Sequence, residues 1–272
     1  MTAAGDSAFA GSIPQLYQQL LVPLIFEPYA ADLAGRIARL APARVLEVAA
    51  GTGVVTRRLA SVLRPATAIV ATDLNQAMLD QAAAVGTGRP VEWRQADALQ
   101  LPFEDQSFDV VVCQFGAMFF PDKPKAFAEA RRVLRPGGRF VLNVWDRIEQ
   151  NELSEAVTHA LAVLFPDDPP RFMARVPHGY CDAAAIARDL ALGGFGRAPE
   201  LATVTARSRA ESARTPAVAY CQGTPLRGEI EARGADRLNE ATDAAEAEIA
   251  RRFGPGPVDA RIQALVIAVE RA

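Results

Sequence analysis

Two glycines follow a short apolar segment and precede a helical pattern in the first third of the chain. Residues 44–48 read Arg-Val-Leu-Glu-Val, and Gly51 and Gly53 come shortly after them. Glycine allows backbone conformations that a side chain forbids and lets a ligand approach the main chain closely. The amides that open the following helix would point toward such a ligand. The stretch is therefore typical of a strand, loop and helix that bind a small molecule through the backbone.

The charges beside this loop indicate which ligand it favours. The dinucleotide motif Gly-x-Gly-x-x-Gly has a third glycine, and that position is Thr56 in this chain. Glu47 lies in the strand before the loop, where the pyrophosphate of a dinucleotide would bring a second negative charge close to it. An ammonium or sulfonium group suits this carboxylate better. The motif therefore favours S-adenosylmethionine, which carries both groups, over a nicotinamide dinucleotide.

A second carboxylate is placed to reach the same ligand. Residues 68–73 form another apolar segment that ends in Asp73, about twenty positions after Gly53. When two parallel strands are neighbours, an acidic residue at the end of the second strand comes beside the loop of the first, within reach of ribose hydroxyls. Asp73 is therefore a candidate for ribose binding.

Strand and helix patterns alternate along most of the chain. Strand character is found in residues 44–48, 68–73, 91–97, 108–114, 139–145, 201–207 and 259–270. Helical periodicity covers 13–40, as two segments, and 54–63, 75–84, 122–134, 156–164, 183–192 and 229–253. This order predicts an α/β fold with a doubly wound, mostly parallel, seven-stranded Rossmann-like sheet and helical insertions that form a lid.

No repeat, low-complexity segment or change in composition marks a domain boundary, so residues 1–272 are interpreted as one domain. Within it we expect N-terminal helices in 1–43 and a cofactor-binding half in 44–146. We expect an inserted lid in 147–199, and strands and a helix in 200–272 that complete the sheet.

The charge and cysteine content narrow the expected partners and compartment. The chain has 29 basic and 32 acidic residues, a net charge of −3, and scattered arginines, so neither nucleic acid nor a membrane surface is an expected partner. Cys113, Cys181 and Cys221 are far apart in sequence and predict neither a disulfide framework nor a Cys-x-x-Cys site. A reducing, cytoplasmic location is expected.

Neither a membrane span nor a metal site is predicted. Residues 7–26 carry no charge, but prolines and glutamines interrupt them, so short helices are the favoured interpretation. The N-terminus also lacks the pattern of a signal peptide. The two histidines, His159 and His178, form no cluster with cysteine in the sequence, so we expect no metal ligand set.

Four segments, taken together and in order, resemble a known family. Residues 45–53, 72–79, 95–103 and 133–139 are similar to the corresponding motifs of class I S-adenosylmethionine-dependent methyltransferases. Within that family they look most like the ubiquinone and menaquinone biosynthesis type. The resemblance covers residues 44–146, and outside it nothing names a substrate.

The resemblance implies a set of contacts with S-adenosylmethionine. The methionyl part would be held by Glu47, Ala49, Gly51, Thr52, Gly53, Gln114 and Phe115, the ribose by Asp73, and the adenine by Leu74, Met78, Asp97 and Ala98. Tyr17 completes the expected cofactor-binding residues. Three of these residues also have a purely structural interpretation, because Met78 and Phe115 suit a core and Asp97 suits a turn cap.

Two other classes of function remain as alternatives. An NAD(P)-dependent oxidoreductase shares the Rossmann-like fold but would need the missing third glycine. A non-catalytic S-adenosylmethionine-binding protein would use the insertion to recognise a partner. Base methylation of nucleic acid is disfavoured, because enzymes of that type resemble one another in Asn or Asp, two prolines and an aromatic residue after the fourth strand, whereas this chain has Cys113-Gln114-Phe115-Gly116.

Methyl transfer from a positively charged sulfur depends mainly on alignment of the reactants. A hydroxyl or carbon nucleophile would gain from a general base, and His178 is the candidate because it is the loop histidine, although it could simply be bonded within its own turn. Aromatic and methionine residues of the flanking segments predict an apolar pocket for a small, apolar or aromatic acceptor: Tyr17, Phe26, Met118, Phe119, Phe120, Phe165, Phe172 and Tyr180. The acceptor itself, its attacking atom and the oligomeric state are left open.

Overall fold

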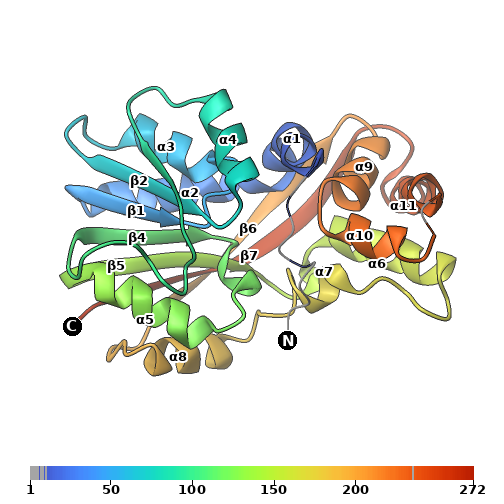
Figure 1. Ribbon diagram of the computed structural model, residues 1–272. Helices are drawn as coiled ribbons and strands as arrows, with labels where there is room; N and C mark the ends of the chain where they lie inside the picture. The colour runs from blue at the N-terminus through green and yellow to red at the C-terminus, as the bar shows by residue number, and fades with distance from the viewer. Residues whose placement is uncertain (1–5, 7–8, 10, 235) are drawn as a thin grey trace.

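A single seven-stranded sheet forms the centre of the computed structural model, which describes residues 6, 9, 11–234 and 236–272 (Figure 1). The strands are β1 (Arg44–Val48), β2 (Ala68–Asp73), β3 (Glu92–Gln95), β4 (Phe108–Gln114), β5 (Leu134–Trp145), β6 (Glu200–Ala210) and β7 (Val258–Glu270). Their order is β3-β2-β1-β4-β5-β7-β6. β1 to β5 run parallel, and β7 runs antiparallel to both of its neighbours. The expected doubly wound, mostly parallel sheet is confirmed.

Helices cover both faces of the sheet. The helices are α1 (Ile13–Leu16), η1 (Tyr17–Phe26), α2 (Glu27–Arg39), α3 (Val54–Val62), α4 (Gln76–Val85), η2 (Ala117–Phe119), α5 (Lys123–Val133), η3 (Ile148–Gln150), α6 (Glu152–Leu164), α7 (Phe172–Arg175), α8 (Ala183–Leu192), α9 (Arg214–Gln222), α10 (Leu226–Glu231) and α11 (Arg237–Phe253). α2, α3 and α4 lie on one face, and α5 and α8 lie on the other (Figure 1). β1 and β4 are nearly continuous apolar runs because both of their faces are buried under these helices.

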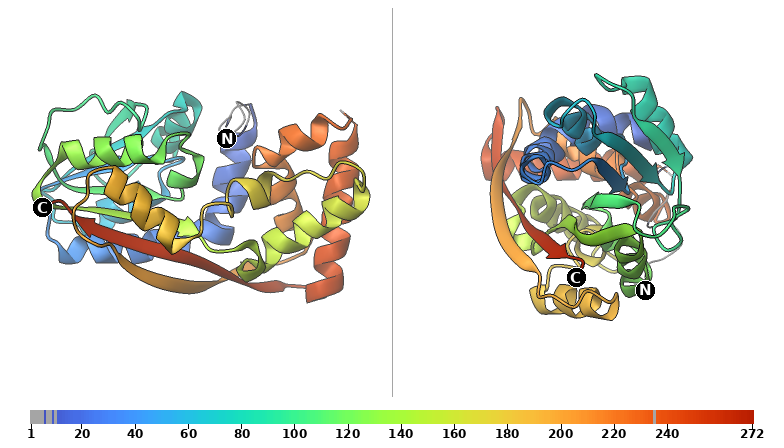
Figure 2. Two further views of the ribbon diagram at one scale, coloured as in Figure 1. Left: turned by 90° about the horizontal axis from the view of Figure 1, so that it is seen from below. Right: turned by 90° about the vertical axis from the view of Figure 1, so that its left-hand side faces the viewer.

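A helical half extends from one end of the sheet. Figure 2 shows β6 and β7 continuing past the parallel strands and carrying α6, α9, α10 and α11, which pack together. The chain between β5 and β6 supplies α6, α7 and α8, but α8 packs against α5 at the sheet. The chain between β6 and β7 supplies α9, α10 and α11. The helical half therefore draws on both 147–199 and 200–272.

Three local expectations differ from the structure. The single helix predicted for 229–253 is wrong, because the chain turns at Gly234, whose φ of 146° a helix cannot contain, and two helices result. α9 was not predicted, because its short run of small residues has little periodicity. The segment 13–40 forms α1, the wide π-type helix η1 and α2 in succession, and Pro23 lies inside η1. Residues 1–5, 7, 8 and 10 of the expected N-terminal region lie outside the described residues.

The described residues contain neither a helix able to cross a membrane nor a cluster of metal ligands. No helix in them combines the length and the apolar character needed to cross a bilayer. Over the same residues, no three His, Cys, Asp or Glu side chains gather as a metal ion would need.

Candidate active site

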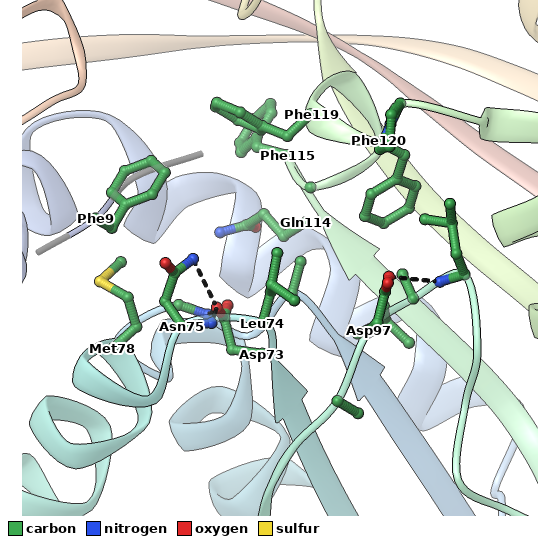
Figure 3. Close-up of a pocket in the computed structure, with 18 of the residues that line it drawn as sticks. Phe9, Asp73, Leu74, Asn75, Met78, Asp97, Gln114, Phe115, Phe119 and Phe120 are labelled. Atoms are coloured by element: carbon green, nitrogen blue, oxygen red, sulfur yellow. Dashed lines mark hydrogen bonds between the residues drawn. The ribbon is translucent and has the colours of Figure 1, made fainter. Parts of the chain in front are cut away.

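A cavity of about 350 Å³ lies beyond the carboxyl ends of β1, β2 and β4. Such an edge is where open α/β sheets bind ligands. Figure 3 shows its side chains converging from these three strands and from the segments above them. Among the residues predicted from sequence, the cavity wall includes Tyr17, Ala49, Gly51, Asp73, Leu74, Met78, Asp97, Ala98, Gln114 and Phe115. The wall also includes Phe119 and Phe120, which the sequence predicted for the acceptor pocket. Its remaining residues were not named as site residues from the sequence: Phe9, Val48, Asn75, Ala96, Leu99, Gly116 and Pro121.

Asp73 joins the two loops that form the floor of the cavity. Its Oδ2 accepts a hydrogen bond of 2.8 Å from the Gly51 amide, and its Oδ1 accepts one of 2.8 Å from the Asn75 amide. Burial raises the pKa of this carboxyl group above its usual value, while the amide hydrogen bonds act in the opposite direction. The side chain is thus fixed in one orientation at the cavity wall, as Figure 3 shows.

The backbone around the cavity is strained at two residues that are not glycine. Ala49 has a φ of 55° and Phe115 a φ of 51°, in the left-handed region that most side chains avoid. The Phe115 amide donates to Asn143 Oδ1 at 2.9 Å, and the Phe115 ring stacks on Trp145 at a centroid distance of 3.9 Å. Such strain costs about 1–3 kcal/mol per residue and is often found at binding sites. These contacts hold the loop after β4 in its shape.

Gly116 is a site residue that the sequence interpretation missed. A Cβ at this position would lie 2.4 Å from the Ala49 Cβ and 2.8 Å from the Cys113 Sγ. The loops after β1 and β4 can therefore approach each other only because residue 116 has no side chain. A glycine directly after the predicted fourth strand was the available signal.

Three predicted cofactor residues lie behind the cavity wall. Glu47 is buried below the loop, and its Oε2 accepts a hydrogen bond of 2.6 Å from Thr56 Oγ1. Gly53 has a φ of 81°, and a Cβ there would lie 2.8 Å from the Trp93 ring. The left-handed backbone and the close packing of Trp93 are therefore sufficient reasons for a glycine at this position. Thr52 is buried and its Oγ1 has no hydrogen-bond partner among the described residues.

The burial of Glu47 leads to a testable pH dependence. Burial raises the pKa of this carboxyl group to about 8, against 4.5 ordinarily, so at intermediate pH the folded protein keeps a proton that the unfolded chain releases. The free energy of unfolding is then expected to fall with rising pH, by up to about 1.4 kcal/mol per pH unit. Urea unfolding of the wild type and of Glu47→Gln at several pH values measures this slope.

The window from pH 6.5 to 8 isolates this effect. Burial lowers the pKa of His178 to about 4, so His178 contributes a slope of opposite sign below its ordinary value of 6.5. Above pH 6.5 that contribution fades, and because it is common to both proteins, Glu47→Gln should show a flatter dependence than the wild type. Parallel curves for the two proteins would contradict the assignment.

One end of the cavity is a slot lined by apolar side chains and one carboxylate. Leu74 is 51% exposed and lies at the cavity wall with Met78 and Phe120, so a large apolar surface faces the open space. Asp97 Oδ1 accepts a hydrogen bond of 2.9 Å from the Leu99 amide. This bond is the turn cap that the sequence suggested as a purely structural role for Asp97. Asp97 also lines the cavity (Figure 3), so the cap orients a carboxylate toward the same slot.

His178, the candidate general base, lines neither this cavity nor the chamber described next. Its Nδ1 lies 2.8 Å from the backbone oxygen of Asp146, and its ring centroid is 6.1 Å from that of Trp145. Because the side chain is buried and its pKa is lowered to about 4, the imidazole is neutral near pH 7. The geometry gives His178 a structural role behind Trp145.

A second, apolar space adjoins the first, which we call the acceptor chamber. Its volume is about 60 Å³, and its walls combine aromatic, aliphatic and methionine side chains. Phe9, Tyr17, Phe115 and Phe119 line both the cavity and the chamber. Of the predicted pocket residues, the chamber includes Tyr17, Phe26, Met118, Phe119 and Phe172, whereas Phe120, Phe165 and Tyr180 do not line it.

The chemistry of the cavity wall fits S-adenosylmethionine. Asp73 and Asp97 are its charged residues, and in the described part of the chain no lysine or arginine lines it, so a pyrophosphate would lack a partner. Gln114 Oε1 is buried without a hydrogen-bond partner among the described residues, and Gln114 points into the cavity (Figure 3).

Residues 46–142 match a sequence family described as methyltransferase domain. The ubiquinone/menaquinone biosynthesis C-methyltransferase UbiE of Hahella chejuensis is 42% identical over 106 residues, which are 38% of this chain and 43% of that protein. This chain therefore matches less than half the length of that curated relative.

Solved structures extend the similarity of fold beyond this segment. An N-methyltransferase of Haemonchus contortus has a TM-score of 0.58 at 15% identity, covering 100% of this chain and 61% of its own. The [4+2]-cyclase SpnF has a TM-score of 0.53 at 21% identity, covering 89% of this chain and 80% of its own. At such identities the likeness concerns the fold alone, and the fold by itself does not decide the reaction.

Residues 46–142 are thus similar to the class I S-adenosylmethionine-dependent methyltransferases, and the seven-stranded α/β sheet agrees with that class. Within that class, its cofactor half is similar to the ubiquinone and menaquinone biosynthesis methyltransferases named UbiE.

Proposed function

We propose that this protein transfers the methyl group of S-adenosylmethionine to a small, apolar or aromatic acceptor. The single observation that carries the proposal is the junction of two different spaces at Tyr17 and Phe115. One space has carboxylates that suit a cationic nucleoside, and the other has the apolar walls that suit a ring. A donor and an acceptor held in these two spaces would meet at the shared wall.

Different residues of the cavity would bind different parts of the cofactor. Asp73 would accept hydrogen bonds from the ribose hydroxyls, and Leu74 and Met78 would flank the adenine, with Asp97 at its edge. Gln114 and the loop from Ala49 to Gly53 would hold the methionyl end. When bound, S-adenosylmethionine supplies a methyl group already activated by positive sulfur.

The chain itself contributes alignment and exclusion of water. Holding two reactants in register can supply about 7–11 kcal/mol of the barrier reduction, so a general base is not required for the main effect. The strained, hydrogen-bonded position of Phe115 gives this part of the wall a defined shape. The name of the UbiE relatives supports a carbon atom of an aromatic ring as the attacking atom, and an oxygen atom is the other candidate.

We place the reaction in the cytoplasm and on a small molecule, without nucleic acid. Cys113 and Cys221 are buried free thiols and Cys181 is also unpaired, which suits a reducing compartment. The basic residues are scattered along the sequence, which does not favour nucleic acid as a partner.

Calorimetry with S-adenosylhomocysteine and with NAD tests the proposal. We expect the first ligand to bind with a dissociation constant in the micromolar range and NAD to show no heat of binding. Turnover is then sought as S-adenosylhomocysteine formation with a panel of phenols and hydroquinones. Binding of NAD alone would favour the oxidoreductase, and cofactor binding without turnover on any acceptor would favour a non-catalytic protein.

Shortening two side chains of the acceptor chamber should affect the acceptor more strongly than the cofactor. Replacing both Met118 and Phe119 by alanine is expected to lower kcat/KM for the acceptor by at least about tenfold, because one or two buried apolar contacts of about 1–3 kcal/mol are lost. Binding of S-adenosylhomocysteine should fall much less than kcat/KM, although Phe119 also lines the cofactor cavity. Val163→Ala is the matched control, because Val163 is 69% exposed on α6. Equal losses for cofactor and acceptor would place these side chains outside the chamber's function.

A further inference from the structure

The start of η1 lies against the loop after β1, residues 49–53, which we call the cofactor loop. Tyr17 is the first residue of η1 and lines the cofactor cavity. A Cβ added at Gly51, in the loop, would lie 4.0 Å from the Tyr17 ring. The position of η1 on this loop therefore shapes one wall of the cavity.

Arg57, on α3, donates hydrogen bonds to both segments at once. Its Nη1 donates to the backbone oxygen of Thr52 at 2.6 Å, and its Nη2 donates to Gln18 Oε1 at 3.1 Å. Thr52 belongs to the cofactor loop, and Gln18 is the second residue of η1. A guanidinium group presents its donors in a planar fork, so one side chain can bind two acceptors from different segments. We call this pair of hydrogen bonds the Arg57 link.

The Arg57 link also fixes one peptide unit of the cofactor loop. Arg57 binds the oxygen of Thr52, and the Gly53 amide of the same peptide unit donates to the Ala50 backbone oxygen at 2.9 Å. Because both ends of this peptide unit are bound, it cannot rotate without losing two hydrogen bonds. The same turn carries the amide that donates to the Asp73 carboxylate at 2.8 Å. The link therefore stabilises the part of the loop that faces the cavity.

The surroundings of Arg57 favour strong hydrogen bonds. The side chain is partly buried, which lowers the pKa of its guanidinium group, while the carboxyl groups of Glu47 and Glu27 act in the opposite direction. A guanidinium group keeps its charge in proteins. Its bonds to the neutral oxygens of Thr52 and Gln18 are therefore charge-assisted, and such bonds are stronger than those between two neutral groups.

We propose that Arg57 is a positioning residue for cofactor binding, because it links the start of η1 to the cofactor loop and so holds Tyr17 at the cavity wall. Arg57 itself does not line the cavity, so it acts through the loop and through Gln18. This inference rests on the proposed function, because it assumes that the cavity binds S-adenosylmethionine.

Calorimetric titration of the full chain with S-adenosylhomocysteine tests the Arg57 link. Arg57→Met is expected to weaken binding at least about tenfold, because it removes two charge-assisted hydrogen bonds. Arg57→Lys keeps the charge but has no fork, so it should weaken binding at least about fivefold. Arg58→Met is the matched control, because Arg58 is exposed on the same helix and its loss should leave the affinity unchanged. Wild-type affinity in either Arg57 variant would overturn the proposal, as would an equal loss in Arg58→Met.

A double-mutant cycle with Gln18→Leu shows whether the two ends of the link act together. Gln18→Leu alone should weaken binding at least about threefold, and it should cause no further loss when Arg57 is already methionine. Gln19→Leu is the control, because Gln19 is exposed on the same helix. If the two losses multiply in the double variant, Arg57 does not act through η1 and the proposal is wrong.

Hydrogen exchange in the free protein gives a readout that needs no ligand. In Arg57→Met the amides of residues 17–26 should exchange at least about tenfold faster than in the wild type, whereas those of α11 should be unchanged. Unchanged exchange in residues 17–26 would overturn the link, and equal acceleration in both helices would show that Arg57 supports the whole fold instead. Gln18→Leu should give the same local effect, and it decides the matter if Arg57→Met loses its fold. Failure of S-adenosylhomocysteine to bind the wild type would refute the proposed function, while hydrogen exchange would still test the link.

Discussion

Asp73→Asn is expected to weaken binding of S-adenosylhomocysteine by about 10- to 150-fold. In the proposed complex the carboxylate accepts hydrogen bonds from two ribose hydroxyl groups, and such charge-assisted bonds are worth about 1.5–3 kcal/mol. The substitution also places an amide nitrogen against the amide of Gly51 or that of Asn75, both of which now donate to the carboxylate at 2.8 Å. The loop after β1 should therefore lose part of its order, and the effect on binding should exceed that of a simple contact.

Isothermal titration with S-adenosylhomocysteine measures this loss, and thermal unfolding shows whether the fold persists. Asp80→Asn is the matched control, because Asp80 lies on α4 and its recorded hydrogen bond is with Gln76 at 2.8 Å. If Asp73→Asn bound S-adenosylhomocysteine with wild-type affinity, Asp73 would not be a cofactor-binding residue. An equal loss of affinity in Asp80→Asn would show that α4, and not this carboxylate, is responsible.

Gly116→Ala is expected to damage both the fold and the cofactor site. The added Cβ would lie 2.4 Å from the Ala49 Cβ, so the loops after β1 and β4 must move apart. Overpacking of this kind costs about 1–3 kcal/mol, which corresponds to a Tm lower by about 2–12 °C for a domain of this size. The φ of Gly116 is −94°, so alanine adds no backbone strain and the effect is steric.

A second substitution tests that cause directly. Ala49→Gly removes the atom that the new Cβ meets, and glycine tolerates the φ of 55° at that position, so the double variant should recover much of the lost Tm and affinity. Gly35→Ala is the control, because no atom lies within 4 Å of its added Cβ inside α2. That variant should be stabilised by about 0.5–1 kcal/mol. No recovery in the double variant would mean that another contact, such as Cys113 Sγ, sets the cost.

The cofactor half could be predicted closely because its signals are local. β1, β2 and β4 begin and end where their apolar runs do, since strands buried on both faces need continuous apolar residues. The glycines at 51 and 53 mark a turn that few other residues could form, as their positive φ values show. The carboxyl ends of neighbouring parallel strands then meet at one edge, which brings Asp73, Asp97 and Gln114 to one cavity.

The site was predicted less well wherever packing between distant segments decides the position. Glu47 and Gly53 belong to the motif, yet side-chain packing turns them away from the cavity wall. His178 is the loop histidine that sequence reasoning favoured as a base, but the fold buries it behind Trp145 and bonds it to Asp146. Phe9 and Gly116 lie at the cavity wall because of contacts with residues far away in sequence, Phe119 and Ala49 respectively.

The amino-acid sequence by itself determined the fold class, the positions of most strands in the cofactor half and the kind of cofactor, because these depend on apolar periodicity, turn glycines and acidic strand ends within short segments. Only the tertiary structure decided how the acceptor side is built. Its walls combine η1, the loop after β4, α7 and α9, which are brought together by the long strands β6 and β7 and by burial of aromatic side chains. No local pattern encodes such contacts, because each of these side chains is buried by residues that lie far away along the chain.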